Sequence, residues 1–64
     1  MYTLKNNGVT IKANISLKEA LETLQAIGRK DYTQIDSLAL YVGQSKTPLV
    51  TGQEVSDFIG KFFF

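Results

Sequence analysis

The side chains that could do acid-base or metal chemistry in this chain are carboxylates, because the sequence contains neither cysteine nor histidine. Disulfides, thiol nucleophiles, imidazole general bases and the zinc or haem sites built on them are therefore excluded, since each needs a thiolate or an imidazole. Six acidic residues remain as candidates: Glu19, Glu22, Asp31, Asp36, Glu54 and Asp57.

The spacing of these carboxylates favours structural roles. Glu19 and Glu22 fall at the start of one expected helix, and Glu54 falls at the start of another, where acidic side chains interact favourably with the helix dipole. Asp31 and Asp36 lack the D-x-D-x-D-G spacing of a calcium loop. A carboxylate-only hydrolase also needs a desolvated pocket, which a domain this small has little depth to form. We therefore predict no catalytic residue and no metal site, unless subunits assemble an active site between them.

A phosphate-binding loop is equally weakly supported. Thr51 and Gly52 precede an expected helix, where free backbone N–H groups could hold an anion. Neither G-x-x-x-x-G-K-[ST] nor G-x-G-x-x-G occurs in the sequence, however. We predict that these residues cap a helix and that the protein carries no cofactor. Binding of a nucleotide-like ligand at a dimer interface stays open.

The charge balance gives no sign of phosphate-backbone binding. Seven Lys and Arg against six Asp and Glu give a net charge of +1 and a pI near 8.0. The N-terminal residues lack the apolar segment of an export signal, and no apolar run approaches the length of a membrane span. We expect a cytoplasmic protein, and the initiating methionine suggests a complete small reading frame.

Two strands are predicted at the N-terminus. Apolar and polar residues alternate over 2–5 and 9–15, and Asn6-Asn7-Gly8 between them is a strong hairpin signal, because Asn and Gly tolerate positive φ. The alternation predicts a buried face made of Tyr2, Leu4, Val9, Ile11, Ala13 and Ile15.

A helix is predicted next, followed by a third strand. Ser16 is an N-cap candidate with Glu19 at the capping-box position, apolar residues recur at helical spacing to Ile27, and Gly28 fits the position just beyond the C-terminus. We interpret 31–36 as a polar connection. Alternation over 37–43 predicts a strand with Leu38, Leu40 and Val42 facing inward.

The C-terminal segment carries a second helix signature. Thr51 is the expected N-cap with Glu54 three residues later, and apolar residues follow at helical spacing: Val55, Phe58, Ile59, Phe62 and Phe63. A strand over 58–64 is the alternative, because Gly60 weakens a helix and aromatic residues favour strands. Leu49 and Val50 are a possible short strand, which Pro48 would confine to an edge.

These elements predict an α+β domain of order ββαβα spanning 1–64. The expected sheet is antiparallel and three-stranded, of order 2-1-3, with two helices packed on one face. The other face would be open and lined by Thr3, Lys5, Thr10, Lys12, Asn14 and Tyr41.

The C-terminal aromatic residues suggest a function. The helical spacing places Phe58 and Phe62 in the core but leaves Phe63 and Phe64 partly exposed on a monomer. Burying a Phe contributes roughly 1.5–3 kcal/mol, which a small domain could gain by pairing or docking. The alternative is an apolar terminus that frays and folds over the sheet edge.

We predict from this a small binding protein that associates stoichiometrically with a larger protein as an inhibitor or modulator, of the kind common in phages and mobile elements. The predicted contact residues are Tyr41, Lys46, Phe63 and Phe64. Homodimerisation is also expected, because it would supplement the small core. A nucleic-acid-binding regulator is the second hypothesis, with Lys5, Lys12 and Tyr41 on the open sheet face.

Overall fold

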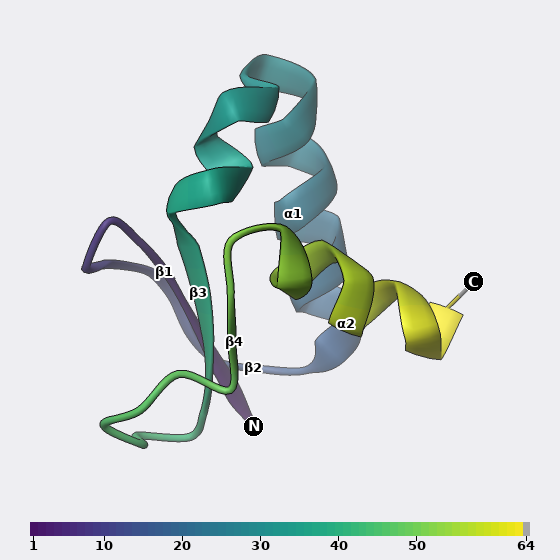
Figure 1. The fold of residues 1–64 in the computed structure, drawn as a ribbon. Helices are drawn as coiled ribbons and strands as arrows, with labels where there is room; N and C mark the ends of the chain where they lie inside the picture. The colour runs from purple at the N-terminus through teal and green to yellow at the C-terminus, as the bar shows by residue number, and fades with distance from the viewer. Residues whose placement is uncertain (64) are drawn as a thin grey trace.

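The fold is a four-stranded sheet with two helices on one side. A computed structural model describes residues 1–63 and places its elements in the order shown in Figure 1. They are β1 (Tyr2–Asn6), β2 (Val9–Ile15), α1 (Leu17–Lys30), the 3₁₀ helix η1 (Tyr32–Ser37), β3 (Leu38–Val42), β4 (Val50–Thr51) and α2 (Gln53–Phe63).

The sheet has the order β2-β1-β3-β4, and all of its neighbouring strands are antiparallel. The predicted α+β class and the 2-1-3 strand order are confirmed. The fourth strand is the two-residue β4, in which Val50 pairs with Leu40 and Thr51 pairs with Ala39. The sheet is therefore one short strand wider than the predicted three, and this strand lies at an edge, one residue later than the possible short strand at Leu49 and Val50.

The predicted hairpin forms, but the predicted burial of β2 is wrong. Asn7 (φ 53°) and Gly8 (φ 84°) both adopt positive φ, as a tight hairpin turn requires. Two register shifts interrupt the pairing of β1 with β2, and Asn14 also has a positive φ of 58°. Of the expected inward residues of β2, Ile15 is buried, whereas Val9 is 69% exposed. Ile11 and Ala13 are exposed as well.

The first helix begins as predicted and ends later. The Ser16 hydroxyl accepts a hydrogen bond from the Glu19 N–H at 3.2 Å, which confirms the N-cap. The helix continues through Gly28 to Lys30, so the predicted glycine stop is wrong. The segment predicted as a polar connection is instead η1, whose Ile35 is 5% exposed and belongs to the core.

The second helix is confirmed as a helix, but Thr51 does not cap it. Thr51 remains in β4, and α2 begins at Gln53. Gly52 lies between them with a φ of 58°, and its N–H donates to the Leu38 carbonyl oxygen at 2.7 Å. This glycine turns the chain directly from the sheet edge into the helix, and its carbonyl oxygen accepts a hydrogen bond from the Val55 N–H at 3.1 Å.

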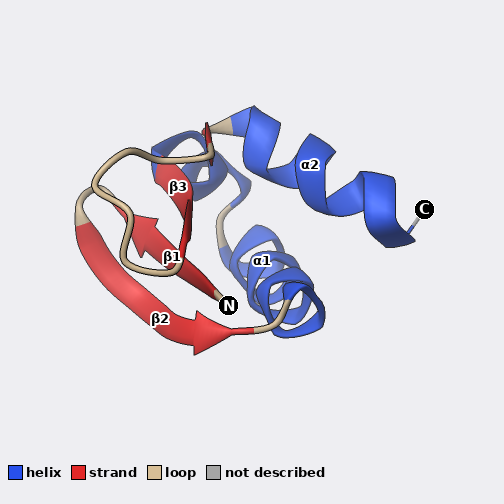
Figure 2. Cartoon of the chain, turned by 90° about the horizontal axis from the view of Figure 1, so that it is seen from below, coloured by secondary structure: helices blue, strands red, loops and turns tan. Residues whose placement is uncertain are grey.

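The core lies between the sheet and the two helices, which cover the same face (Figure 2). Leu4, Leu40, Val55 and Ile59 are each 0% exposed. Phe58 packs against this core as expected, but Phe62 is 60% exposed, so its predicted place in the core is wrong. The remaining core residues are Ile15, Ala20, Leu24, Ile35 and Leu38.

Within residues 1–63, no helix has both the length and the apolar character needed to cross a membrane. Across the same residues, the acidic side chains form no cluster of three that could hold a metal ion.

Candidate functional site: the groove between the helices

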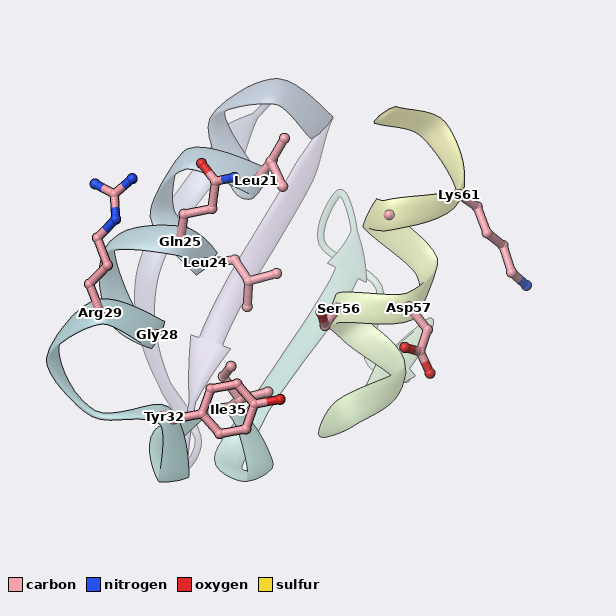
Figure 3. A pocket seen from close by; sticks show the side chains of 11 residues that line it. Leu21, Leu24, Gln25, Gly28, Arg29, Tyr32, Ile35, Ser56, Asp57 and Lys61 are labelled. Carbon is pink, nitrogen blue, oxygen red and sulfur yellow. The ribbon is translucent and has the colours of Figure 1, made fainter. Parts of the chain in front are cut away.

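An open groove of about 760 Å³ runs between α1 and α2. Its floor is apolar and is formed by Leu21 and Leu24 of α1 together with Ile35 of η1 (Figure 3). Leu24 and Ile35 are core residues, so the groove reaches the edge of the hydrophobic core. A surface of this kind suits apolar side chains of a binding partner.

Small residues keep this groove open. Gly28 on α1, and Ser56 and Gly60 on α2, line its walls. Both glycines lie within helices, where each costs about 1 kcal/mol relative to alanine. A Cβ at Gly28 would lie 3.7 Å from the Ile35 Cδ1 atom, which is an ordinary contact. Close packing therefore does not require glycine at this position, and the hollow is retained at a cost in helix stability.

The rim of the groove carries charge and one exposed aromatic ring. Arg29 and Lys61 extend away from the groove on its two sides, and Asp57 accompanies Lys61 on α2 (Figure 3). Tyr32 lies across the end nearest Ser56 and is 67% exposed. The rim therefore combines both signs of charge with apolar surface.

The position of Tyr32 is fixed by the residue before it. The Asp31 carboxylate accepts hydrogen bonds from the Thr33 hydroxyl at 2.6 Å and from the Thr33 N–H at 3.1 Å. These two hydrogen bonds hold the pKa of Asp31 below its usual value, and the bond from the Thr33 hydroxyl has the larger effect. The Asp31 N–H also donates to the Ile27 carbonyl oxygen at 2.9 Å, so one residue joins the end of α1 to the start of η1.

The last turn of α2 exposes two phenylalanines. Phe62 is 60% exposed, and its ring centroid lies 5.2 Å from that of Phe58, with the planes inclined at 41°. Phe63 is 42% exposed. It follows Gly60 by three residues and Ser56 by seven, so it shares the groove side of the helix. The two rings thus point to different sides of α2.

The structure does not bring the four predicted contact residues together. Tyr41 is half-buried and alternates with the buried Leu40, which places it on the sheet face away from the helices. Lys46 is exposed in the loop between β3 and β4, and Phe63 is the last residue of α2, on the opposite side of the sheet from Tyr41. Phe64 lies outside the described residues.

The open sheet face is also less regular than predicted. Lys5 pairs with Thr10, but the register shift places Lys12 opposite the buried Leu4 and out of line with that pair. The Lys5 Nζ atom lies 4.8 Å from the centroid of the Tyr41 ring. This cation–π contact occupies one face of the aromatic ring that the nucleic-acid hypothesis requires for base stacking.

Sequence reasoning missed the groove residues, above all Tyr32, Gly28 and Gly60, and it also missed the exposure of Phe62 on another side of α2. Tyr32 lies in the segment 31–36, which the sequence pattern predicts to be a polar connection and which is η1 in the structure. Gly28 and Gly60 were interpreted as a helix stop and a weak point, although two glycines within helical apolar patterns are a usable signal of a helix-helix hollow.

No protein-family model, curated protein or solved structure matches this chain.

Proposed function

We propose that this protein acts by stoichiometric association with a larger protein, as an inhibitor or modulator of that protein. The observation that supports the proposal is the exposure of the Phe62 ring, which is 60% accessible at the end of α2. In this proposal the protein acts inside the cell, as small proteins of phages or other mobile elements do.

Phe62 has the properties of an interface anchor. Exposure of most of a phenylalanine forgoes a large part of the roughly 1.5–3 kcal/mol that its burial would contribute. The contact with Phe58 orients the ring before binding, which lowers the entropy lost when a partner covers it. Large, preoriented aromatic side chains are typical centres of protein-protein interfaces.

The other predicted contact residues take different places around this anchor. Phe63 lies next to Phe62 in the chain, and Phe64 remains a proposed contact on the basis of the sequence. Tyr41 and Lys46 lie on the far side of the sheet and its loop, so they would contact only a partner that reaches around the domain. The centre of the proposed interface is therefore the end of α2.

The nucleic-acid hypothesis has less support. Its platform would be the outer sheet face, where Lys5 already covers one face of Tyr41. A salt titration separates the two proposals, because phosphate contacts make the logarithm of the affinity fall linearly with the logarithm of the salt concentration. Binding of single-stranded DNA or RNA with such a slope would favour the second hypothesis.

The test is quantitative affinity purification from the native host with three versions of the protein. We expect the wild-type chain to recover one larger protein in a fixed molar ratio, and Phe62→Lys to lose it because a charge then replaces the anchor. Val9→Lys is the matched control, since Val9 is a comparably exposed apolar residue (69%) at the hairpin.

Equal recovery by Phe62→Lys and the wild-type chain would show that the end of α2 is not the contact. Loss of the partner with Val9→Lys as well would point to a general effect of added charge. Circular dichroism of all three versions checks that each is folded.

A further inference from the structure

We propose that the groove between α1 and α2 binds α2 of a second copy of this chain, in a twofold-symmetric dimer whose two α2 helices run antiparallel. This goes beyond association with a larger protein, because it uses the opposite side of α2 from Phe62. In a twofold dimer each surface meets its own equivalent, so the surface must be complementary to itself. Three features of the groove meet that condition.

The first feature is the charge pattern along α2. Asp57 and Lys61 are exposed side chains on the rim of the groove, one helical turn apart on α2. When two such helices cross antiparallel midway between these residues, Asp57 of each copy faces Lys61 of the other. Opposite charges therefore meet at two equivalent places, whereas a parallel arrangement would place like charges together.

The second feature is the small side chains near the crossing point. Ser56 and Gly60 line the groove from α2, and Gly28 lines it from α1. Residues without bulky side chains allow helix backbones to approach closely, and the charged pairs then come within reach of one another. Close approach of the second copy would therefore give the two glycines a function that offsets their cost to helix stability.

The third feature is the placement of two exposed aromatic residues, with Tyr32 at one end of the groove and Phe63 at the end of α2, beyond the other end. Tyr32 lies at the Ser56 end, and Leu21 lies towards the Lys61 end (Figure 3). Phe63 is seven residues beyond Ser56, about 10 Å further along the helix axis. The antiparallel arrangement brings Phe63 of the second copy to the Tyr32 end, where it covers a ring that is 67% exposed.

These three features together favour a second copy over an unrelated helix. An unrelated partner would have to supply an acid, a base and an aromatic residue in the same spacing, which this chain already presents. Binding also covers the apolar floor formed by Leu21 and Leu24, and burial of that floor drives association. The charged pairs set the direction of the helices.

The experiment measures the dimer dissociation constant of charge-swapped variants by sedimentation equilibrium. Asp57→Lys places lysine against Lys61 at both contacts, and Lys61→Asp places aspartate against Asp57. We expect each single swap to raise the dissociation constant about tenfold or more. The double variant Asp57→Lys/Lys61→Asp restores opposite charges, and its dissociation constant should return to within about threefold of the wild-type value.

Restoration of the wild-type dissociation constant by the double variant is the decisive result. If the single swaps acted through a general effect of charge on folding, the second swap would not reverse that effect. Both positions are exposed, and circular dichroism confirms helix content in each variant. A monomeric wild-type chain at its highest soluble concentration would overturn the proposal. A dimer that is insensitive to both single swaps, or one that the double variant fails to restore, would also overturn it. None of these outcomes depends on capture of a larger partner through Phe62.

Discussion

The two strands of the N-terminal hairpin follow the same alternating pattern but end in different environments. β1 lies between two strands, and its Leu4 is 0% exposed beneath the helices. β2 lies at the sheet edge, and its hairpin end is away from both helices (Figure 2). Val9, the first residue of β2, is 69% exposed. Alternation therefore indicates a strand and its two faces, whereas burial depends on what covers each face.

The reach of α1 explains this difference. The helix starts directly after β2 and covers the part of the sheet nearest that junction, so Ile15 is buried. Ile11 lines a second hollow with Ala26 and Ile27 of α1 and remains 37% exposed. Val9, two residues closer to the hairpin turn than Ile11, is 69% exposed.

The largest expected effect is on β1. Leu4→Ala should reduce the free energy of unfolding by about 2–5 kcal/mol, because it removes methyl groups from a fully buried site. A single core of this size rarely provides more than about 3–5 kcal/mol, so the variant should be largely unfolded at 25 °C. Urea denaturation followed by circular dichroism measures the change.

Val9→Ala provides the control for Leu4→Ala, with an expected change of about 0.5 kcal/mol or less. Equal losses in the two variants would contradict the contrast between the strands.

An intermediate effect is expected at the irregular end of β2. Asn14 has a φ of 58°, which a β-branched residue adopts with difficulty, so Asn14→Val should cost about 1–2 kcal/mol. Asn14→Gly is the matched variant and should be neutral or slightly stabilising, because glycine adopts positive φ freely. Thermal unfolding of both variants ranks them, and the reverse order would show that β2 is regular at this point.

The smallest effect is expected on the outer face of β1. Replacement of Lys5 by Met keeps an extended side chain but removes the ammonium group 4.8 Å from the Tyr41 ring centroid. The expected loss is about 0.5–1 kcal/mol. Stability measured in the Tyr41→Leu background supplies the control, since Lys5→Met should have almost no effect there. An equal loss in both backgrounds would exclude the cation–π contact as its cause.

Most of the fold could be predicted from local signals. The Asn7-Gly8 turn, the Ser16 cap and the helical spacing from Val55 to Ile59 are each determined by residues close in sequence. The errors concern tertiary context. Gly28 does not stop α1, because the backbone hydrogen bond from Asp31 to Ile27 continues the helical pattern past the glycine.

The candidate site was less predictable for the same reason. A groove forms where two helices meet, and their meeting depends on the turn at Gly52 that sets the direction of α2. Phe62 has the spacing of a core residue, but the helix extends past the sheet and carries the ring into solvent. Periodicity assigns a residue to a face of its helix and does not show where the neighbouring layer ends.

The irregular pairing of β2 also bears on aggregation. An edge strand with free backbone N–H and C=O groups can act as a template for another chain, and exposed valine and isoleucine would strengthen such pairing. The register shifts and the positive φ at Asn14 break the regular ladder that a further strand would need. At the other edge, β4 is only two residues long and follows Pro48 closely. Both edges therefore resist growth of the sheet into fibrils, although the domain leaves so much apolar surface uncovered.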